Sequence, residues 1–445
     1  MSTYEAPVVE DVLVTSPPEP MALSEQRVIE KKSFKAPIVM GALTLLLALL
    51  WLLDRRPGAV RFQLTGGADW LSGLPILEPN AATVAWICIA VMVLMTLLAW
   101  WRSNTYNRQW LWAVAIFAIG AMGAFLSWAG AGLAGSISII DLIGQALLLA
   151  IPLVFGALGG VIGERAGVVN IAIEAQLLMA AFTATVVASL TQNPWAGLIA
   201  AMVAGLAVAA LLGVFAINYG IEQVIIGVVL NVLIAGITTF LLNGWLHTDQ
   251  QRLNNTLHIR FSPIAIPLLS RIPIIGPALF NQNILVYLMY LAVIGVWFAL
   301  YRTRWGLRVR AVGEHPKAAD TMGIKVRGTR WRALLIAGAI AGIGGASYTL
   351  VGNGQFNREM TAGFGYIALA AVIFGNWDPV RAAFAALLFG FAISLQTILG
   401  IIGSPVPSQF MLMLPYLVTL LAVAGLVGKS RAPAADGVAY SVEGH

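Results

Sequence analysis

The sequence predicts an all-α fold, a polytopic membrane bundle of about twelve transmembrane helices. Hydrophobic residues make up 59% of the 445 residues, and charged residues only 10%. The mean hydropathy of the chain is +0.85. Soluble domains carry roughly a quarter charged residues, so a water-soluble fold is excluded. The apolar side chains must instead face lipid and one another.

Apolar runs near the roughly 20 residues that cross a bilayer core recur along the chain. The predicted spans are residues 36–53, 82–101, 111–130, 139–161, 171–190, 195–217, 223–245, 284–301, 333–352, 381–402 and 408–427. A shorter run, 362–376, is interrupted by glycines and is counted as a full or partial crossing. With it the number of crossings is even, so both termini are predicted to lie on the same side.

Basic residues are concentrated in connections that share one side of the predicted membrane. The connection 302–332 contains many arginines and lysines against only Glu314 and Asp320. Loops rich in Lys and Arg remain in the cytoplasm, so this loop and, by alternation, both termini are predicted to be cytoplasmic. Arg55 and Arg56 fall on the outer side and depart from this rule. The net charge of +6 therefore reflects orientation, and no nucleic-acid partner is expected.

The long loop 246–283 is predicted to be extracytoplasmic. It is rich in Pro, Asn and Gln and carries few charges. Long loops in compact folds are often functional. This loop is therefore interpreted as a lid, a docking surface for an external protein, or a structured connector.

The chain divides into a packed core and additions at both ends. Residues 1–35 mix Pro, Glu and Ser without periodicity, which predicts a flexible cytoplasmic tail. Small residues spaced four apart let helices approach closely in lipid, and they locate a tightly packed core that begins near residue 139. We therefore expect a core over 139–427, additional transmembrane segments over 36–135, and a cytoplasmic tail over 428–445. The glycines and the alanine of this spacing pattern are Gly156, Gly159, Gly160, Gly163, Gly167, Gly338, Gly342 and Ala346.

Polar groups interrupt the apolar pattern near the start of the core. Asn170, Glu174 and Gln176 lie at or beyond the junction of two apolar segments. Polar groups at membrane depth are costly, so they usually face a cavity or a partner. Their spacing cannot place all three on one helical face, and Asn170 and Glu174 are the pair expected to face a pore together.

Similar interruptions occur in the second half of the core. One begins at Asn353–Asn357 and continues through Gly363–Tyr366 to Gly375–Pro379. Broken segments in corresponding positions of two halves point to a translocation site. Between the two halves, polar residues from Glu222 lead into a helix that contains Asn231. We therefore predict translocation-pathway roles for Asn170, Glu174, Asn231 and Asn376.

The cytoplasmic loop contains the most readable motif, which runs from Gly313 to Ile324. Proline favours the first helical turn and glycine ends helices, so residues 316–322 are predicted to form a short two-turn helix. An ordinary positive-inside loop would explain the arginines but not a capped helix between them. The motif is therefore interpreted as a protein-docking element formed by Glu314, His315, Pro316, Lys317, Ala318, Ala319, Asp320 and Gly323.

No catalytic or metal-binding constellation is evident, so the chain is not expected to be an enzyme. The four histidines have no metal-ligand spacing, and Cys88 is the only cysteine. Residues 423–430 are similar to a phosphate-binding loop, but Val423 stands where that loop requires glycine. ATP is therefore not expected to bind this chain through such a loop.

These motifs together resemble the transmembrane permeases of bacterial ABC importers, in the branched-chain amino acid/ribose permease superfamily. The nucleoside and simple-sugar group is the most similar. Its GERAGVVNIAIEG-Q run is matched from Gly163 to Gln176, with Ala175 in place of the glycine. Its Glu-Val-Ile and Leu-Asn signature is matched over 222–231, with Gln223 inserted. The G-E-N-P signature is matched over 313–324, with His315 in place of asparagine, and a G-F-x-x-I-A pattern is matched over 363–379.

The resemblance implies one subunit of a larger importer in the bacterial plasma membrane. Its partners would be a second permease, identical or different, two ATPase subunits that bind ATP and magnesium, and an external solute-binding protein or lipoprotein. The helix at 316–322 would be the coupling helix that transmits ATPase closure. Nucleosides are the favoured solute, with simple sugars and amino acids as alternatives.

Two other classes are weighed against this hypothesis. In an ion-coupled secondary transporter, the intramembrane carboxylate of Glu174 would carry protons, but the 302–332 motif would have no purpose. A membrane-embedded enzyme is disfavoured because the sequence has no paired acid and base and no metal cluster.

Overall fold

The computed structural model describes residues 34–63, 76–106, 111–273, 275–404, 409–410, 413 and 431–440. Within these residues, ten helices are long and apolar enough to cross a membrane. The predicted all-α polytopic bundle is thereby confirmed. The predicted span 408–427 lies almost wholly outside the described residues. The glycine-broken run 362–376 forms α14 (Phe364–Phe374), which at 11 residues is too short to span alone.

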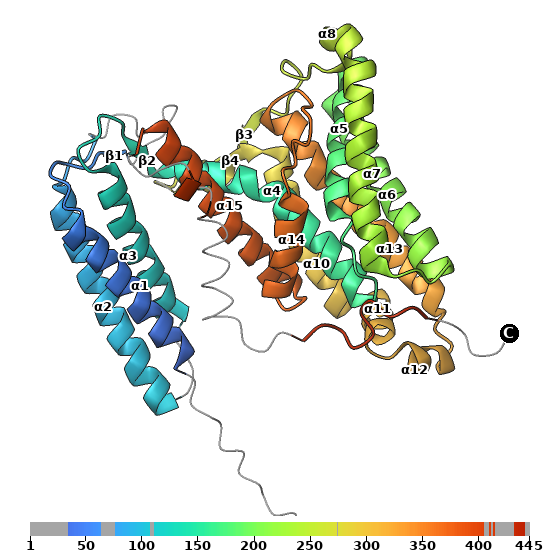
Figure 1. Ribbon diagram of the computed structural model, residues 1–445, viewed down its shortest axis with the longest axis horizontal. Coiled ribbons are helices and arrows are strands. Elements are labelled where there is room, and N and C mark those ends of the chain that lie inside the picture. The colour runs from blue at the N-terminus through green and yellow to red at the C-terminus, as the bar shows by residue number, and fades with distance from the viewer. Residues whose placement is uncertain are drawn as a thin grey trace, which may run out of the picture.

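The elements follow the predicted order (Figure 1). The N-terminal helices are α1 (Lys35–Leu53), α2 (Ala81–Tyr106) and α3 (Leu111–Gly130). The long core helices are α4 (Ile139–Arg165), α5 (Ile173–Thr191), α6 (Pro194–Gly213), α7 (Gln223–Gly244), α10 (Ile284–Arg302), α13 (Val326–Ser347) and α15 (Pro379–Ile401). Two π-helical turns, Val214–Asn218 and Tyr348–Gly352, extend α6 and α13.

Short polar residues and prolines set the starts of several core helices. The side chains of Ser138, Asn193, Asn283 and Asp378 accept backbone N–H groups at the starts of α4, α6, α10 and α15. These side chains satisfy donors that the first helical turn leaves free. Proline occupies the first turn of α6 and of α15. It has no backbone N–H, but an N–H at this position has no acceptor within the helix, so no hydrogen bond is lost.

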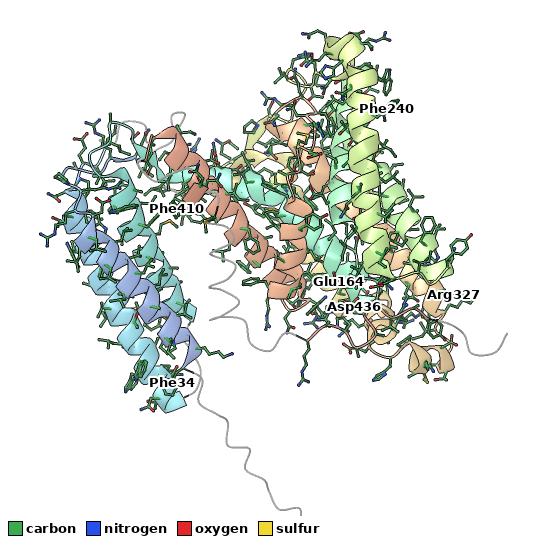
Figure 2. The ribbon with its side chains drawn as sticks, in the orientation of Figure 1. Phe34, Glu164, Phe240, Arg327, Phe410 and Asp436 are labelled. Carbon is green, nitrogen blue, oxygen red and sulfur yellow. The ribbon has the colours of Figure 1, made fainter. Side chains whose placement is uncertain are left out.

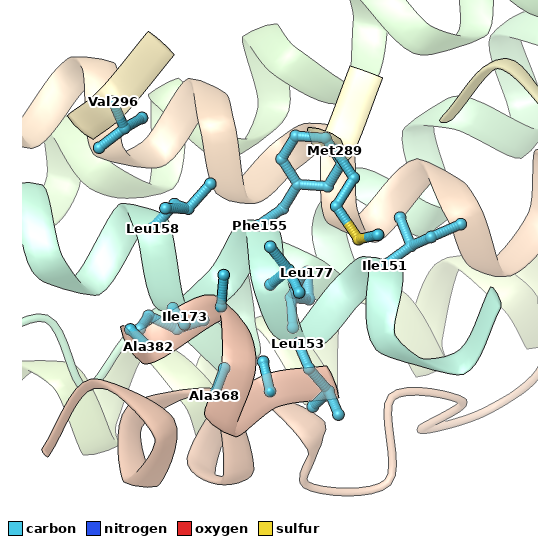
Figure 3. Close-up of a cluster of buried hydrophobic side chains, with 14 of the residues drawn as sticks. Ile151, Leu153, Phe155, Leu158, Ile173, Leu177, Met289, Val296, Ala368 and Ala382 are labelled. Carbon is cyan, nitrogen blue, oxygen red and sulfur yellow. The ribbon is translucent and has the colours of Figure 1, made fainter. Parts of the chain in front are cut away.

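Helix α4 lies at the centre of the core. Its side chains form one apolar cluster with α5, α10, α14 and α15, and Figure 3 shows Phe155 and Leu158 of α4 beside Met289 and Val296 of α10. Phe155 and Leu158 are fully buried. The surrounding helices therefore share α4 as a common packing partner.

The predicted small-residue seams are helix contacts. A Cβ at Gly156 would lie 2.9 Å from the Cβ of Ala368, and one at Gly159 would lie 2.8 Å from the carbonyl oxygen of Ala337. Gly338 on α13 similarly approaches the backbone of Gly205 on α6. Side chains at these glycines would force the helices apart, so close backbone approach decides how α4, α6, α13 and α14 pack.

The first three helices form a separate bundle that joins the core at one end (Figure 1). There β1 (Phe62–Gln63) pairs in parallel with β2 (Ile137–Ser138), which directly precedes α4. Apolar residues of α15, among them Leu399, pack into the same cluster. The arginines that break the charge rule lie at this junction, where Arg56 pairs with Asp54 at 2.7 Å and covers the ring of Trp128.

The two ends of the molecule differ in structure. One end carries the long loop, which folds into a 3-10 turn, α8 (Gln250–Leu253), the hairpin of β3 (Pro263–Ala265) and β4 (Asn281–Asn283), and α9 (Ile275–Phe280). The loop is thus a structured connector, one of the forms expected for it. The other end carries α11 (Arg304–Glu314) and α12 (Pro316–Thr321), and Figure 2 shows Phe34 and Asp436 at this same end.

Candidate translocation and coupling sites

The first predicted interruption is a non-helical turn of the chain, residues 166–172, between α4 and α5. Asn170 is fully buried there and exchanges two hydrogen bonds with Gln176, at 3.1 and 3.3 Å. Helical spacing predicted that Gln176 would not share a helical face with Asn170 and Glu174. This spacing does not apply to Asn170, because Asn170 lies in the turn and not on the helix.

The second interruption meets the first at Glu174. One carboxylate oxygen accepts hydrogen bonds from the Thr361 hydroxyl at 2.6 Å and the Gly363 amide at 2.9 Å, and the other accepts from the Gly365 amide at 2.6 Å. These donors lie at the N-terminus of α14, where free N–H groups and the helix dipole favour an anion. The two broken segments predicted from the sequence therefore close on each other through this carboxylate.

Asn231 of α7 fixes the same junction from a third helix. Its side-chain oxygen accepts the Ala175 amide at 2.9 Å. Its amide nitrogen donates to the Ile171 carbonyl and to the Tyr366 hydroxyl, both at 3.0 Å. We call the group of Glu174, Asn231, Thr361, Gly363, Gly365 and Tyr366 the carboxylate junction.

The carboxylate junction has one accessible side. Thr361 and Asn231 are buried, Glu174 is half-buried, and Tyr366 is 47% exposed. A side chain at Gly365 would collide with the backbone of Glu174, so the close approach of α14 to α5 requires glycine there. The junction thus presents a phenol ring at the point where three helices are tied together by polar groups.

Asn376 lies apart from the carboxylate junction. It belongs to the turn between α14 and α15, where Arg165 donates to the Trp377 carbonyl at 2.9 Å and to the Asn376 carbonyl at 3.5 Å. Trp377 in turn donates its indole N–H to Glu164 at the end of α4. Of the four predicted pathway residues, Glu174 and Asn231 both bind the start of α14, and Asn170 is linked to them through α5. Asn376 instead contacts the C-terminal end of α4.

The predicted docking helix is present as α12, which is confirmed as a short helix that begins at Pro316. Gly323 follows it in the left-handed conformation, with φ of +78°. Ala319 is 5% exposed and packs against Val312 and Val326. The remaining predicted docking residues are exposed except Pro316, which is half-buried: they are Glu314, His315, Lys317, Ala318, Asp320 and Gly323.

A continuous set of contacts connects α12 with the carboxylate junction. Gly313, in the last turn of α11, lies against the carbonyl of Arg165, where any side chain would collide. Arg165 binds the turn after α14, and the other end of α14 binds Glu174. A displacement of the cytoplasmic loop therefore has a contiguous route of packed backbone and hydrogen bonds to the junction.

Several residues of these sites were not assigned a role from the sequence. Gln176, Thr361 and Tyr366 lie within or beside the sequence motifs. Gln176 pairs with Asn170 through the turn 166–172, whereas Thr361 and Tyr366 meet their partners only where the second broken segment reaches α5 and α7. Arg330 was counted only as a cytoplasmic arginine, but it is 2% exposed. Gln223, read as an insertion, is buried and accepts the Val169 amide at 2.6 Å. Among the described residues, no cluster of His, Cys, Asp or Glu could hold a metal ion.

A membrane bundle whose helices are broken by polar turns has the architecture of a transport protein. A family model described as the branched-chain amino acid transport system permease component matches residues 142–423, and the chain belongs to this family. The chain is therefore a permease subunit of an ABC transporter.

Curated relatives agree with this assignment. The nucleoside ABC transporter permease protein NupC of Lactococcus lactis is 37% identical over 67% of this chain and 96% of its own length. The guanosine ABC transporter permease protein NupQ of Bacillus subtilis is 39% identical over 66% of this chain and 94% of its own length. The putative glucose ABC transporter permease protein TsgC13 of Haloferax volcanii is 40% identical over 56% of this chain and 74% of its own length. No solved structure matches the chain significantly.

Proposed function

We propose that this chain is the membrane-spanning subunit of an ATP-driven importer of nucleosides in the bacterial plasma membrane. The observation that carries the proposal is its similarity to two permeases named for nucleoside and guanosine transport, which it matches over nearly their whole length. A sugar importer is the second candidate, because a permease named for glucose is similar over a shorter region.

Other chains complete this importer. A second permease forms the other half of the pathway, two ATPase subunits bind ATP and magnesium, and an external protein delivers the solute. The exposed surface of α12 supports ATPase docking, because a helix held at its inner side by Ala319 leaves its outer side available to a partner.

In the proposed cycle, ATP binding closes the partner subunits and moves α12. The contacts through Gly313 and Arg165 carry this movement to α14, and Glu174 ties α14 to α5. Asn170, Glu174 and Asn231 then act as pathway residues by setting the relative positions of the helices that line it. The exposed phenol of Tyr366 is the group of the carboxylate junction available to the solute.

Uptake measurements test the proposal. Cells that express the whole importer should accumulate labelled guanosine, and excess unlabelled uridine should compete more strongly than glucose or leucine. Uptake should stop when ATP is depleted while the proton gradient is maintained. Accumulation that follows the gradient instead would support the ion-coupled alternative, and stronger competition by glucose would support the sugar importer.

A further inference from the structure

Residues 431–440 lie against the cytoplasmic end of the core, and we call them the C-terminal strap. The Arg431 amide donates to the side chain of Asn376 at 3.1 Å. The Ala434 amide donates to the carboxylate of Glu314 at 3.3 Å, and the Ala435 amide donates to the Gly313 carbonyl at 2.9 Å. The strap thus binds both the turn after α14 and the end of α11.

The strap also contacts the first turn of the core and the base of α13. A Cβ at Gly167 would lie 2.9 Å from the Ala435 carbonyl oxygen. Arg330 donates to the Val438 carbonyl at 2.8 Å. Tyr440 packs against the small apolar cluster that contains Ala319 of α12. One ten-residue segment therefore touches every element that connects α12 with the membrane helices.

A group of ionisable side chains lies beneath the strap. Arg330 is 2% exposed, Glu164 is 3% exposed, and Asp436 of the strap is half-buried. Figure 2 shows Asp436 beside Glu164, and Asp436 also interacts with Arg330. Arg330 Nε and Nη2, Glu164 Oε1 and Asp436 Oδ1 are buried without a hydrogen-bond partner among the described residues. Buried charges are costly when a partner is removed, so loss of the strap would leave Arg330 without its acceptor, the Val438 carbonyl, and without the Asp436 carboxylate.

We propose that the C-terminal strap is a positioning element of the coupling apparatus. It stays docked and holds α11 and α12 against the turns 166–172 and 375–378, so that movement of a docked ATPase reaches α14. This inference rests on the proposed function, because it assumes that α12 receives the ATPase. It predicts that disturbing the strap separates ATP hydrolysis from transport.

Two strap variants and one control test the proposal in the complete importer reconstituted in liposomes. Ala435→Trp places a large ring at a position that is 7% exposed, and a second variant ends the chain after residue 430. Val438→Trp is the matched control, because that side chain is 54% exposed. The measurement is labelled guanosine transported per ATP hydrolysed.

Both strap variants should transport about tenfold less solute per ATP, within the usual range of coupling between sites, while the ATPase rate persists. The Val438→Trp control should match the unmodified importer. A merely structural defect would lower transport and hydrolysis together. An unchanged transport-to-ATP ratio in both strap variants, at normal membrane levels, would overturn the proposal.

A cross-linking experiment does not depend on whether those variants fold. Glu314→Cys and Ala434→Cys are combined with Cys88→Ala and joined by a short bifunctional maleimide. Cross-linking should proceed efficiently and leave transport per ATP equal to that of the same double-cysteine protein before cross-linking, because the strap does not need to release. Loss of transport on cross-linking, or failure to cross-link, would contradict the proposal. An unmodified importer that takes up no nucleoside refutes the proposed solute, whereas the cross-link still reports on the strap.

Discussion

Glu174 shows how a residue placed by sequence acquires its role from its partners. Both of its carboxylate oxygens accept hydrogen bonds from the N-terminal region of α14. The N-cap residue of α14 forms no side-chain hydrogen bond with the helix. The Glu174 carboxylate therefore acts first as the cap of α14. We therefore interpret Glu174 as a residue that holds the two halves of the core together, and not as a proton carrier.

Replacing this carboxylate should weaken the core. Glu174→Gln retains one acceptor oxygen but turns an amide donor toward the other donors, and hydrogen bonds to charged groups contribute about 1.5–3 kcal/mol each. The purified variant should therefore unfold at a lower temperature, as measured by the loss of the monodisperse peak on heating. Glu359→Gln is the control, because the side chain of Glu359 is 61% exposed and its carboxylate forms a long ion pair with Arg358, at 3.7 Å. Equal stability of the two variants would contradict the capping role.

Asp436 predicts a pH dependence of strap docking. Burial raises the pKa of its carboxyl from 3.8 to about 7, although Arg330 partly opposes this. The ionisable groups that face it are Arg330 of α13 and Glu164 of α4. The docked strap binds the proton more tightly than an undocked strap, so docking should weaken as the pH rises from about 4 to about 7 and change little above that.

Maleimide labelling of Ala435→Cys in the Cys88→Ala protein measures this effect. The same cysteine in an Asp436→Asn protein supplies the reference, because the reactivity of the thiol itself then cancels. The labelling rate with Asp436 present, divided by the rate in the Asp436→Asn protein, should rise between pH 5.5 and 7 and then level off. A ratio independent of pH would show that Asp436 does not control docking.

At the scale of single elements, α12 separates its two alanines. Ala318 is exposed, whereas Ala319 packs against α11 and α13. A substitution at Ala319 disturbs the helix itself, but a substitution at Ala318 changes only the surface offered to a partner. The sequence alone had treated the two as equivalent members of one docking motif.

Ala318→Arg should therefore abolish ATP-dependent uptake while leaving the permease inserted and stable. The ATPase should co-purify less with the variant, because a long charged side chain occupies the docking surface. Gly328→Arg provides a control at an exposed position on the same side of the membrane, where an added Cβ meets only Lys325 at 3.8 Å. Normal uptake by Ala318→Arg would remove α12 from the ATPase interface.

At the scale of the whole molecule, the distribution of basic residues predicts the orientation in the membrane. The basic connection is expected to hold α12 in the cytoplasm, which would leave the loop with β3 and β4 facing outward. Met322 is 81% exposed near α12, and Leu268 is 79% exposed in the opposite loop. In the Cys88→Ala protein, a membrane-impermeant maleimide should label Leu268→Cys in intact cells and Met322→Cys only after the membrane is opened. The reverse pattern would invert the topology.

Much of the fold was predictable because lipid imposes a simple requirement. A backbone that crosses hydrocarbon must satisfy its hydrogen bonds internally, so apolar runs of spanning length become helices. The spans from α1 to α7, and then α10, α13 and α15, were each expected near their observed bounds. The run that forms α14 was expected as a glycine-interrupted full or partial crossing, and only its observed length of 11 residues shows that it is too short to cross alone.

The sites were predictable as motifs but not as contacts. The sequence marked two polar interruptions, and it identified Glu174 and Asn231 within or near them. It paired Asn170 with Glu174, whereas the structure pairs it with Gln176. Linear spacing describes neighbours on one helix, but here the partners are brought together by a turn and by a second broken segment 187 residues further along the chain.

The sequence by itself determined that this protein is a membrane bundle and where α12 begins, and it predicts which end faces the cytoplasm, because hydropathy, charge and helix-start signals are local. Only the tertiary structure decided that Glu174 caps α14, that α6 and α13 meet at glycines, and that residues 431–440 form a strap over Arg330 and not a free tail. These depend on segments far apart in the chain, and their pairing is selected by backbone approach and by the need to satisfy buried polar groups.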